Sequence, residues 1–113
     1  MQVAELNTTQ TTKGLSRLAR LIWIYEAGQN SELMDRVLDK VFAQEAADAQ
    51  AAIELLDVDI QNYERQYGML SEEFDSQFHA GELGDGMDFI EWSSLILMRS
   101  HLQQRLEILT GNL

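Results

Sequence analysis

The 113-residue sequence contains no cysteine and no proline. Without cysteine, the chain can form neither a disulfide framework nor a thiolate metal site. Because proline interrupts helix interiors and is common in loops, its absence predicts long helices joined by few turns. Cations are also scarce, with 8 Lys and Arg against 19 Asp and Glu and a formal net charge of -11. Such a surface repels phosphate backbones and favours a basic partner over a nucleic acid.

The sequence also lacks a long hydrophobic run. The longest apolar stretch, 21–25, is too short to span a bilayer, and the N-terminus does not show the pattern of a signal peptide. Hydrophobic residues nevertheless make up 45% of the chain, a normal share for a globular protein. We therefore expect a cytoplasmic protein that makes no membrane contact and folds as a single helical domain, 1–113.

A regular apolar pattern predicts one long helix over 31–67. Its members alternate at spacings of four and three, as in a coiled-coil seam: Phe42, Ala46, Ala49, Ile53, Leu56, Ile60, Tyr63 and Tyr67. The alanine-rich stretch 46–52 is where a break in this helix would be expected. It reflects either high helix propensity or the close approach of a neighbouring helix, and we favour close approach.

Three shorter helices are predicted around the long one. Apolar residues that fall on one face indicate helices over 14–27, 71–80 and 88–110, preceded by a mobile arm at 1–12. Trp23 and Trp92, each among aliphatic residues, are expected to anchor the core rather than to hold a cofactor, with a role at an interface as the alternative.

Residues with preferences for helix ends set the expected boundaries. Gly68 and Gly111 suit the left-handed position that follows a helix. Ser71 is expected to cap the helix over 71–80, and Asp85 or Asp88 the last helix.

These elements predict an all-α fold, an antiparallel helical hairpin or bundle with one long central helix. The last helix carries Arg99 in its seam and Arg105 beside it, and its long connector lets it fold back along the acidic edges of the long helix. At about 33 Å it covers part of a helix about 55 Å long. We expect oligomerisation or a complex to complete the bundle. The alternative is a monomer in which the first helix covers the remainder.

Catalytic and metal-binding patterns are weak. Glu-x-x-Asp pairs place two carboxylates within reach of one divalent ion; they occur at Glu32/Asp35, Glu45/Asp48, Glu54/Asp57, Glu72/Asp75 and Glu82/Asp85. All-helical nucleotide pyrophosphohydrolases hold magnesium with paired motifs of this sort, but no cations cluster with these pairs to bind phosphate. His79 and His101 lack the preceding acid of a di-iron motif. We predict no catalytic residue, no cofactor and no metal.

The basic residues Lys13, Arg17 and Arg20 form one small cluster near the N-terminus. Residues 1–30 hold these three cations and two acids, so their charge is +1 while the rest of the chain is -12. Three cations contact DNA weakly in one copy, so we expect nucleic-acid binding through them only in an oligomer or a complex.

A stretch of about 30 residues resembles a segment that recurs in small acidic proteins of bacteria and archaea. The resemblance rests on four motifs: Tyr67-Gly68, the helix start Ser71-Glu72-Glu73-Phe74, the turn Gly81-Glu82-Leu83-Gly84-Asp85, and Glu91-Trp92. These relatives look like antitoxin components of toxin-antitoxin modules. The sequence departs from their pattern at Leu70, Ser93 and Ser94, and the resemblance does not extend to residues 1–50.

The resemblance implies an antitoxin-like protein that wraps a small basic toxin-like partner. The other expected contacts of the helical seam are helices of the same chain or of a second copy. The expected partner-binding residues are acidic seam edges and aromatic residues: Glu45, Asp57, Asp59, Glu64, Tyr63, Tyr67, Phe74, Phe78, Phe89 and Trp92. The aromatic residues could instead serve to hold the last helix on the long one. A structural homo-oligomeric protein without enzymatic activity and a magnesium-dependent nucleotide pyrophosphohydrolase remain as alternatives.

Overall fold

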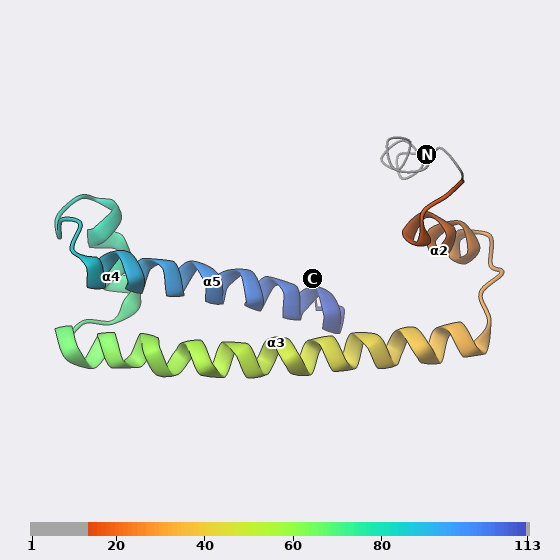
Figure 1. Cartoon of the computed structure of the whole chain (residues 1–113), viewed down its shortest axis with the longest axis horizontal. Helices are drawn as coiled ribbons and strands as arrows, with labels where there is room; N and C mark the ends of the chain where they lie inside the picture. Colours follow the sequence, from red (N-terminus) through yellow and green to blue (C-terminus); the bar gives the residue numbers. More distant parts are fainter. Residues whose placement is uncertain (1–13, 113) are drawn as a thin grey trace. The chain divides into compact units, whose positions relative to one another are not determined.

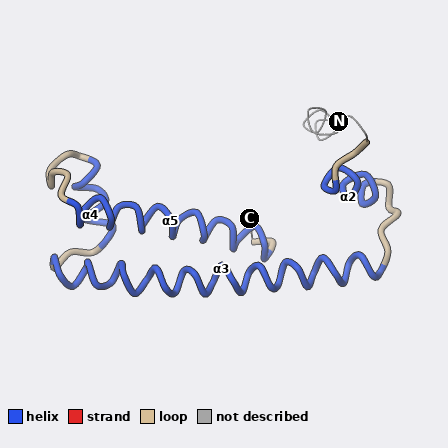
Figure 2. The backbone as a smooth tube through the Cα atoms, in the orientation of Figure 1, coloured by secondary structure: helices blue, strands red, loops and turns tan. Residues whose placement is uncertain are grey.

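The structure is a computed structural model that describes residues 14–112. Within that range it contains four helices and no strand: α2 (Arg17–Glu26), α3 (Glu32–Tyr67), α4 (Ser71–His79) and α5 (Met87–Thr110). Short loops join them (Figure 2). The predicted all-α fold is confirmed. The mobile arm predicted at 1–12 lies outside the described residues.

The chain divides into two compact units, one ending at Asp39 and the other beginning at Lys40. Helix α3 contributes its first turns to the N-terminal unit and the rest to the C-terminal unit. Each unit is therefore described by itself. That the chain folds as a single domain stays a prediction.

In the N-terminal unit, side chains fix both the start of α2 and the turn that follows it. The Ser16 hydroxyl accepts a hydrogen bond from the Ala19 N–H at 3.2 Å and so caps α2. Asp35 accepts hydrogen bonds from the Tyr25 hydroxyl at 2.7 Å and from Asn30 at 3.1 Å. Trp23 is 46% exposed, so the expectation that it anchors the core is wrong. The buried residue of α2 is Ala19 instead.

Helix α3 runs for 36 residues without a break at the alanine-rich stretch. Ser31 caps its start by accepting a hydrogen bond from the Met34 N–H at 3.1 Å. At its other end Gly68 has a φ of +63°, and the Met69 N–H donates to the Glu64 carbonyl at 3.1 Å. Because glycine adopts this left-handed conformation without steric cost, the helix ends where the sequence predicted.

Helix α5 folds back along the C-terminal part of α3 to form an antiparallel hairpin (Figure 1). The predicted seam of α3 supplies the buried face: Ala49, Ile53 and Ile60 are buried, and Ala46, Leu56 and Tyr63 are half-buried. Burial of Ala49 favours the close-approach interpretation of the alanine-rich stretch. Phe42 is 46% exposed and lies beyond Glu45, the residue of α3 that pairs with Arg105 of α5.

The two helix caps predicted around α4 and α5 are wrong. Ser71 is the first residue of α4, not its cap, and its N–H donates at 2.8 Å to the Glu64 carboxylate of α3. A neighbouring helix thus satisfies one of the first N–H groups of α4, which have no partner within the helix. The N-cap position of α5 is Gly86, with no side-chain hydrogen bond, and Asp88 lies in the first turn.

Two aromatic side chains form the most deeply buried part of the C-terminal unit. Phe74 of α4 and Trp92 of α5 are fully buried, so the prediction that Trp92 anchors the core is confirmed.

Among the described residues, no helix is both long and apolar enough to cross a membrane.

Candidate functional site

Six aromatic residues join three helices at the elbow, the region where α3 ends, α4 follows and α5 begins. The rings of Phe74 and Trp92 stack with their centroids 3.8 Å apart. Tyr63 also stacks on Trp92, with the two centroids 5.8 Å apart. Tyr67 contacts Phe89 at 5.1 Å, and Phe78 stacks on Phe74 at 5.3 Å. The structure therefore brings all six predicted aromatic residues together and places them where they hold α4 and α5 on α3.

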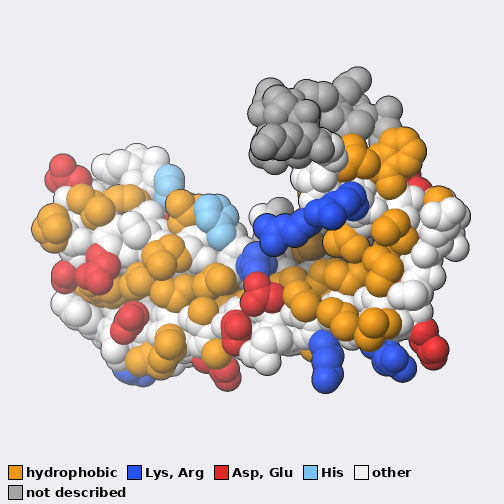
Figure 3. All heavy atoms as spheres, turned by 45° about the vertical axis from the view of Figure 1, so that its right-hand side comes forward, with side chains coloured by type: hydrophobic (Ala, Val, Ile, Leu, Met, Phe, Trp, Pro, Cys, Tyr) orange, Lys and Arg blue, Asp and Glu red, His pale blue; other side chains and the backbone are white. Residues whose placement is uncertain are grey.

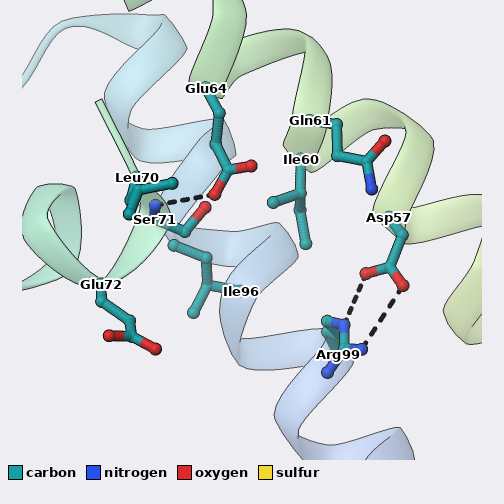
Figure 4. A pocket seen from close by; sticks show the side chains of 9 residues that line it. All are labelled: Asp57, Ile60, Gln61, Glu64, Leu70, Ser71, Glu72, Ile96 and Arg99. Carbon is teal, nitrogen blue, oxygen red and sulfur yellow. Dashed lines mark hydrogen bonds and ion pairs between the residues drawn. The ribbon is translucent and has the colours of Figure 1, made fainter. Parts of the chain in front are cut away.

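Beside this cluster lies an open hollow of about 400 Å³, which we call the elbow hollow. Ile60, Leu70 and Ile96 supply its apolar lining, one from α3, one from the loop and one from α5 (Figure 4). Its remaining lining residues are polar or charged: Asp57, Gln61, Glu64, Ser71, Glu72 and Arg99. An apolar floor with a charged rim can take an apolar side chain while its neighbours meet the carboxylates.

The charges around the elbow hollow are unequal, with three carboxylates and one guanidinium. The guanidinium is already engaged, because Arg99 Nε lies 2.5 Å and Nη2 3.4 Å from the two Asp57 carboxylate oxygens. This side-chain hydrogen bond to Asp57 raises the pKa of Arg99. Glu64 accepts from the Ser71 N–H, whereas Glu72 is exposed at the rim. The hollow is therefore suited to a cationic group.

A second hollow, of about 310 Å³, lies on the other side of Ile60 on α3, and we call it the tyrosine hollow. It is lined by Asp59, Asn62, Tyr63, Gln66, Asp88 and Glu91. The Tyr63 hydroxyl donates to the Glu91 carboxylate, and the Tyr67 hydroxyl donates to Asp88 at 2.5 Å. The pKa of Tyr63 is raised to about 12, mainly by the hydrogen bond to Glu91 and secondly by burial of the phenol.

The structure places the four predicted acidic partner residues in different roles, although Asp57 and Glu64 both line the elbow hollow. Asp57 pairs with Arg99, and Glu45 accepts from Arg105 at 2.8 Å, so both hold α5 on α3. Glu64 serves the start of α4 and also lines the elbow hollow. Asp59 is exposed and lines the tyrosine hollow. Sequence reasoning missed Glu72, Asp88 and Glu91 as lining residues. The available signal was their place near helix starts: Glu72 and Asp88 lie in the first turns of α4 and α5, and Glu91 follows Asp88 by three residues.

At least one carboxylate in four of the five Glu-x-x-Asp pairs is engaged within the protein. Asp35 accepts from Tyr25, Glu45 from Arg105, and Asp57 from Arg99, while Asp75 lies 3.2 Å from the ring of His79. Over residues 14–112, no group of three or more His, Cys, Asp or Glu side chains is placed to hold a metal ion.

The predicted basic cluster is described in part. Arg17 and Arg20 are exposed on α2, and Arg20 Nε donates to the Ser16 carbonyl at 3.4 Å. Lys13 lies outside the described residues.

Comparison with known proteins identified no matching family model, no similar curated protein and no similar solved structure.

Proposed function

We propose that this protein is a cytoplasmic binding module of the antitoxin type, which neutralises a small basic partner protein held at the elbow hollow. The observation that carries the proposal is the lining of that hollow, in which an apolar floor is surrounded by Asp57, Glu64 and Glu72. An apolar side chain of the partner would enter beside Ile60 and Ile96. A neighbouring Lys or Arg of the partner would meet Glu72, whose charge is exposed.

The long-range electrostatics favour the same class of partner. With a net charge of -11, the protein attracts a cationic surface and accelerates its association, most strongly at low salt. The tyrosine hollow adds Asp59, Asp88 and Glu91 on the other side of α3, so a partner that follows the elbow meets carboxylates on both sides. Neutralisation of this kind needs no chemistry by the protein itself.

The first test uses native mass spectrometry of the full chain, tagged and recovered gently from its own cells. The proposal expects a stoichiometric companion that is small and basic and that dissociates as salt is raised. The expected functional result is that the companion inhibits growth when expressed alone, and that co-expression with this protein restores growth. Recovery of the protein without a basic companion would overturn the proposal.

A pair of charge reversals locates the binding site. Glu72→Lys changes the rim of the elbow hollow, whereas Glu73→Lys changes the adjacent exposed acid, which does not line the hollow. Both acids lie in the first turn of α4, so the two reversals perturb the helix dipole similarly. Glu72→Lys should weaken companion binding at least about tenfold, the effect of losing one good charge pair. Equal binding by both variants would place the partner elsewhere.

A second pair tests the apolar lining. Leu70→Glu places a charge at a side chain that is 68% exposed and lines the hollow, and Leu55→Glu does the same at a side chain of α3 that is 73% exposed and lies outside it. Binding should be lost in the Leu70 variant and kept in the Leu55 variant. The reverse result would exclude the elbow hollow as the binding site.

A further inference from the structure

Helix α5 carries apolar residues on the side that faces away from α3 as well as on the side that contacts it. Ile90, Leu97 and Ile108 are 44%, 57% and 56% exposed, and they lie opposite the buried Trp92 at 100° per residue. In the space-filling view, hydrophobic side chains likewise reach the surface of the hairpin (Figure 3). Because these apolar side chains are exposed, the outer side of α5 lacks a partner within the C-terminal unit.

The exposed residues of α5 form a second seam. From Met87 they alternate at spacings of three and four: Met87, Ile90, Ser94, Leu97, His101, Gln104 and Ile108. All seven are exposed, and none is acidic. Because the chain carries 19 acids, a continuous helical face without one lets two copies meet with little like-charge repulsion.

The geometry points to a homodimer in which this outer face of α5 packs antiparallel against the same face of a second copy. The seam has two alternating positions, called a (Met87, Ser94, His101 and Ile108) and d (Ile90, Leu97 and Gln104). In an antiparallel coiled coil, an a residue of one helix faces a d residue of the other. Centring the pairing on α5 places Ile90 opposite Ile108 of the second copy and Leu97 opposite His101. Both apolar ends are thereby covered, and the arrangement is self-complementary, as a two-fold dimer requires.

Charges beside the seam favour the antiparallel orientation. Glu91, Met98 and Arg105 flank it on one edge, and antiparallel pairing brings that edge against itself. Glu91 then lies opposite Arg105 of the second copy, twice by symmetry, and Met98 meets its own equivalent. Arg105 is bound to Glu45 through one nitrogen, with side-chain exposure of 54%, so other donors are free to bind a second carboxylate. A parallel pairing would instead put His101 against His101.

The size of this face sets the expected affinity. Residues 87–108 span about 33 Å, and two such faces bury on the order of 1,000 Å², at the lower edge of specific interfaces. We therefore expect a dimer with a dissociation constant in the micromolar range. The elbow hollow lies on the α3-facing side of α5, so self-association does not depend on the proposed basic partner.

The test is sedimentation equilibrium of the full chain alone, over a concentration series in the micromolar range. The mass should rise from 12.9 kDa for the monomer towards twice that value. Leu97→Glu should weaken self-association at least about tenfold, because both copies lose an apolar contact. Leu55→Glu, on the outer side of α3, is the matched control and should leave the constant unchanged. A monomer throughout, or sensitivity to Leu55→Glu instead of Leu97→Glu, would overturn the inference.

Two further variants test the orientation. Because the chain has no cysteine, Ile90→Cys and Ile108→Cys give single thiols about 27 Å apart along α5. Oxidation of an equimolar mixture should give the disulfide between the two different variants, whereas a parallel dimer would give disulfides between identical variants. Disulfides between identical variants would overturn the antiparallel orientation.

Discussion

The indole nitrogen of Trp92 donates a hydrogen bond to the hydroxyl oxygen of Ser71 across 3.0 Å. Trp92 belongs to α5 and Ser71 begins α4, while the Ser71 N–H donates to Glu64 of α3. One serine therefore connects all three helices of the elbow. The stack of Trp92 on Phe74 surrounds this link with apolar surface, where a donor left without a partner costs free energy.

Removing the Ser71 hydroxyl should destabilise the protein by about 1 kcal/mol, since it leaves the part-buried indole N–H without its acceptor. Trp92→Ala, which empties the centre of the core, should cost about 3–5 kcal/mol. Urea unfolding followed by circular dichroism measures both. In the Trp92→Phe background Ser71→Ala should have little effect, and an equal cost in both backgrounds would show that the hydroxyl acts elsewhere.

The Asp57–Arg99 pair should contribute more to the stability of the fold than the Glu45–Arg105 pair. The side chains of Asp57 and Arg99 are 32% and 40% exposed, and two hydrogen bonds join them. The side chains of Glu45 and Arg105 are 43% and 54% exposed, and one hydrogen bond joins them. Double-mutant cycles with Asp57→Asn and Arg99→Gln should give a coupling of about 1 kcal/mol, reduced by solvent screening, and about half of this for the second pair. Equal couplings, or couplings insensitive to salt, would contradict this ranking.

Alkaline pH should weaken the elbow through Tyr63. Its folded pKa of about 12 exceeds the ordinary value of 10.0 because the neutral phenol donates to Glu91. The stabilisation is therefore fully present below pH 10, and it is lost as pH rises through about 12. The free energy of unfolding of the wild type should fall more steeply over this window than that of Tyr63→Phe. Other titrations affect both proteins alike, so parallel curves would refute the assignment.

Replacing Gly68 should show how strictly α3 must end at this residue. Gly68→Ala forces a side chain into a φ of +63° and should destabilise the protein by about 1–2 kcal/mol. Gly68→Asn is the matched control, because asparagine tolerates this conformation better, and it should cost less. No atom lies within 4 Å of the added Cβ, so the difference reports backbone strain rather than a clash. Equal unfolding midpoints for the two variants would argue against strain.

The helices were predictable because their signals are local. The seam from Phe42 to Tyr67 and Gly68 after it predicted 31–67, and α3 spans 32–67. Likewise α5 spans 87–110 where 88–110 was expected. Periodicity and a terminal glycine lie within one segment of sequence, so they can be read without knowing the fold.

The site was less predictable because it depends on the register between helices. Asp57 and Arg99 were both noted in the sequence, but their pairing is fixed by the geometry of the elbow between them. The same holds for Ser71, whose preference for a cap position was overridden by Glu64 from α3 and by the indole of Trp92. Periodicity assigns a residue to a face, whereas its partner across that face is set by tertiary structure.

The uneven burial along α5 has a consequence for how the hairpin opens. Trp92 and Leu95 are its buried residues, and in the described stretch 96–112 every residue is half-buried or exposed. Amide protons should therefore exchange fastest near Thr110 and slowest near Trp92, so that local unfolding starts at the C-terminal end of the helix. Leu97 and Ile108 of the proposed interface lie in this weakly held half. Association of two copies would thus order the very segment that frays first, and protein concentration would set how often it opens.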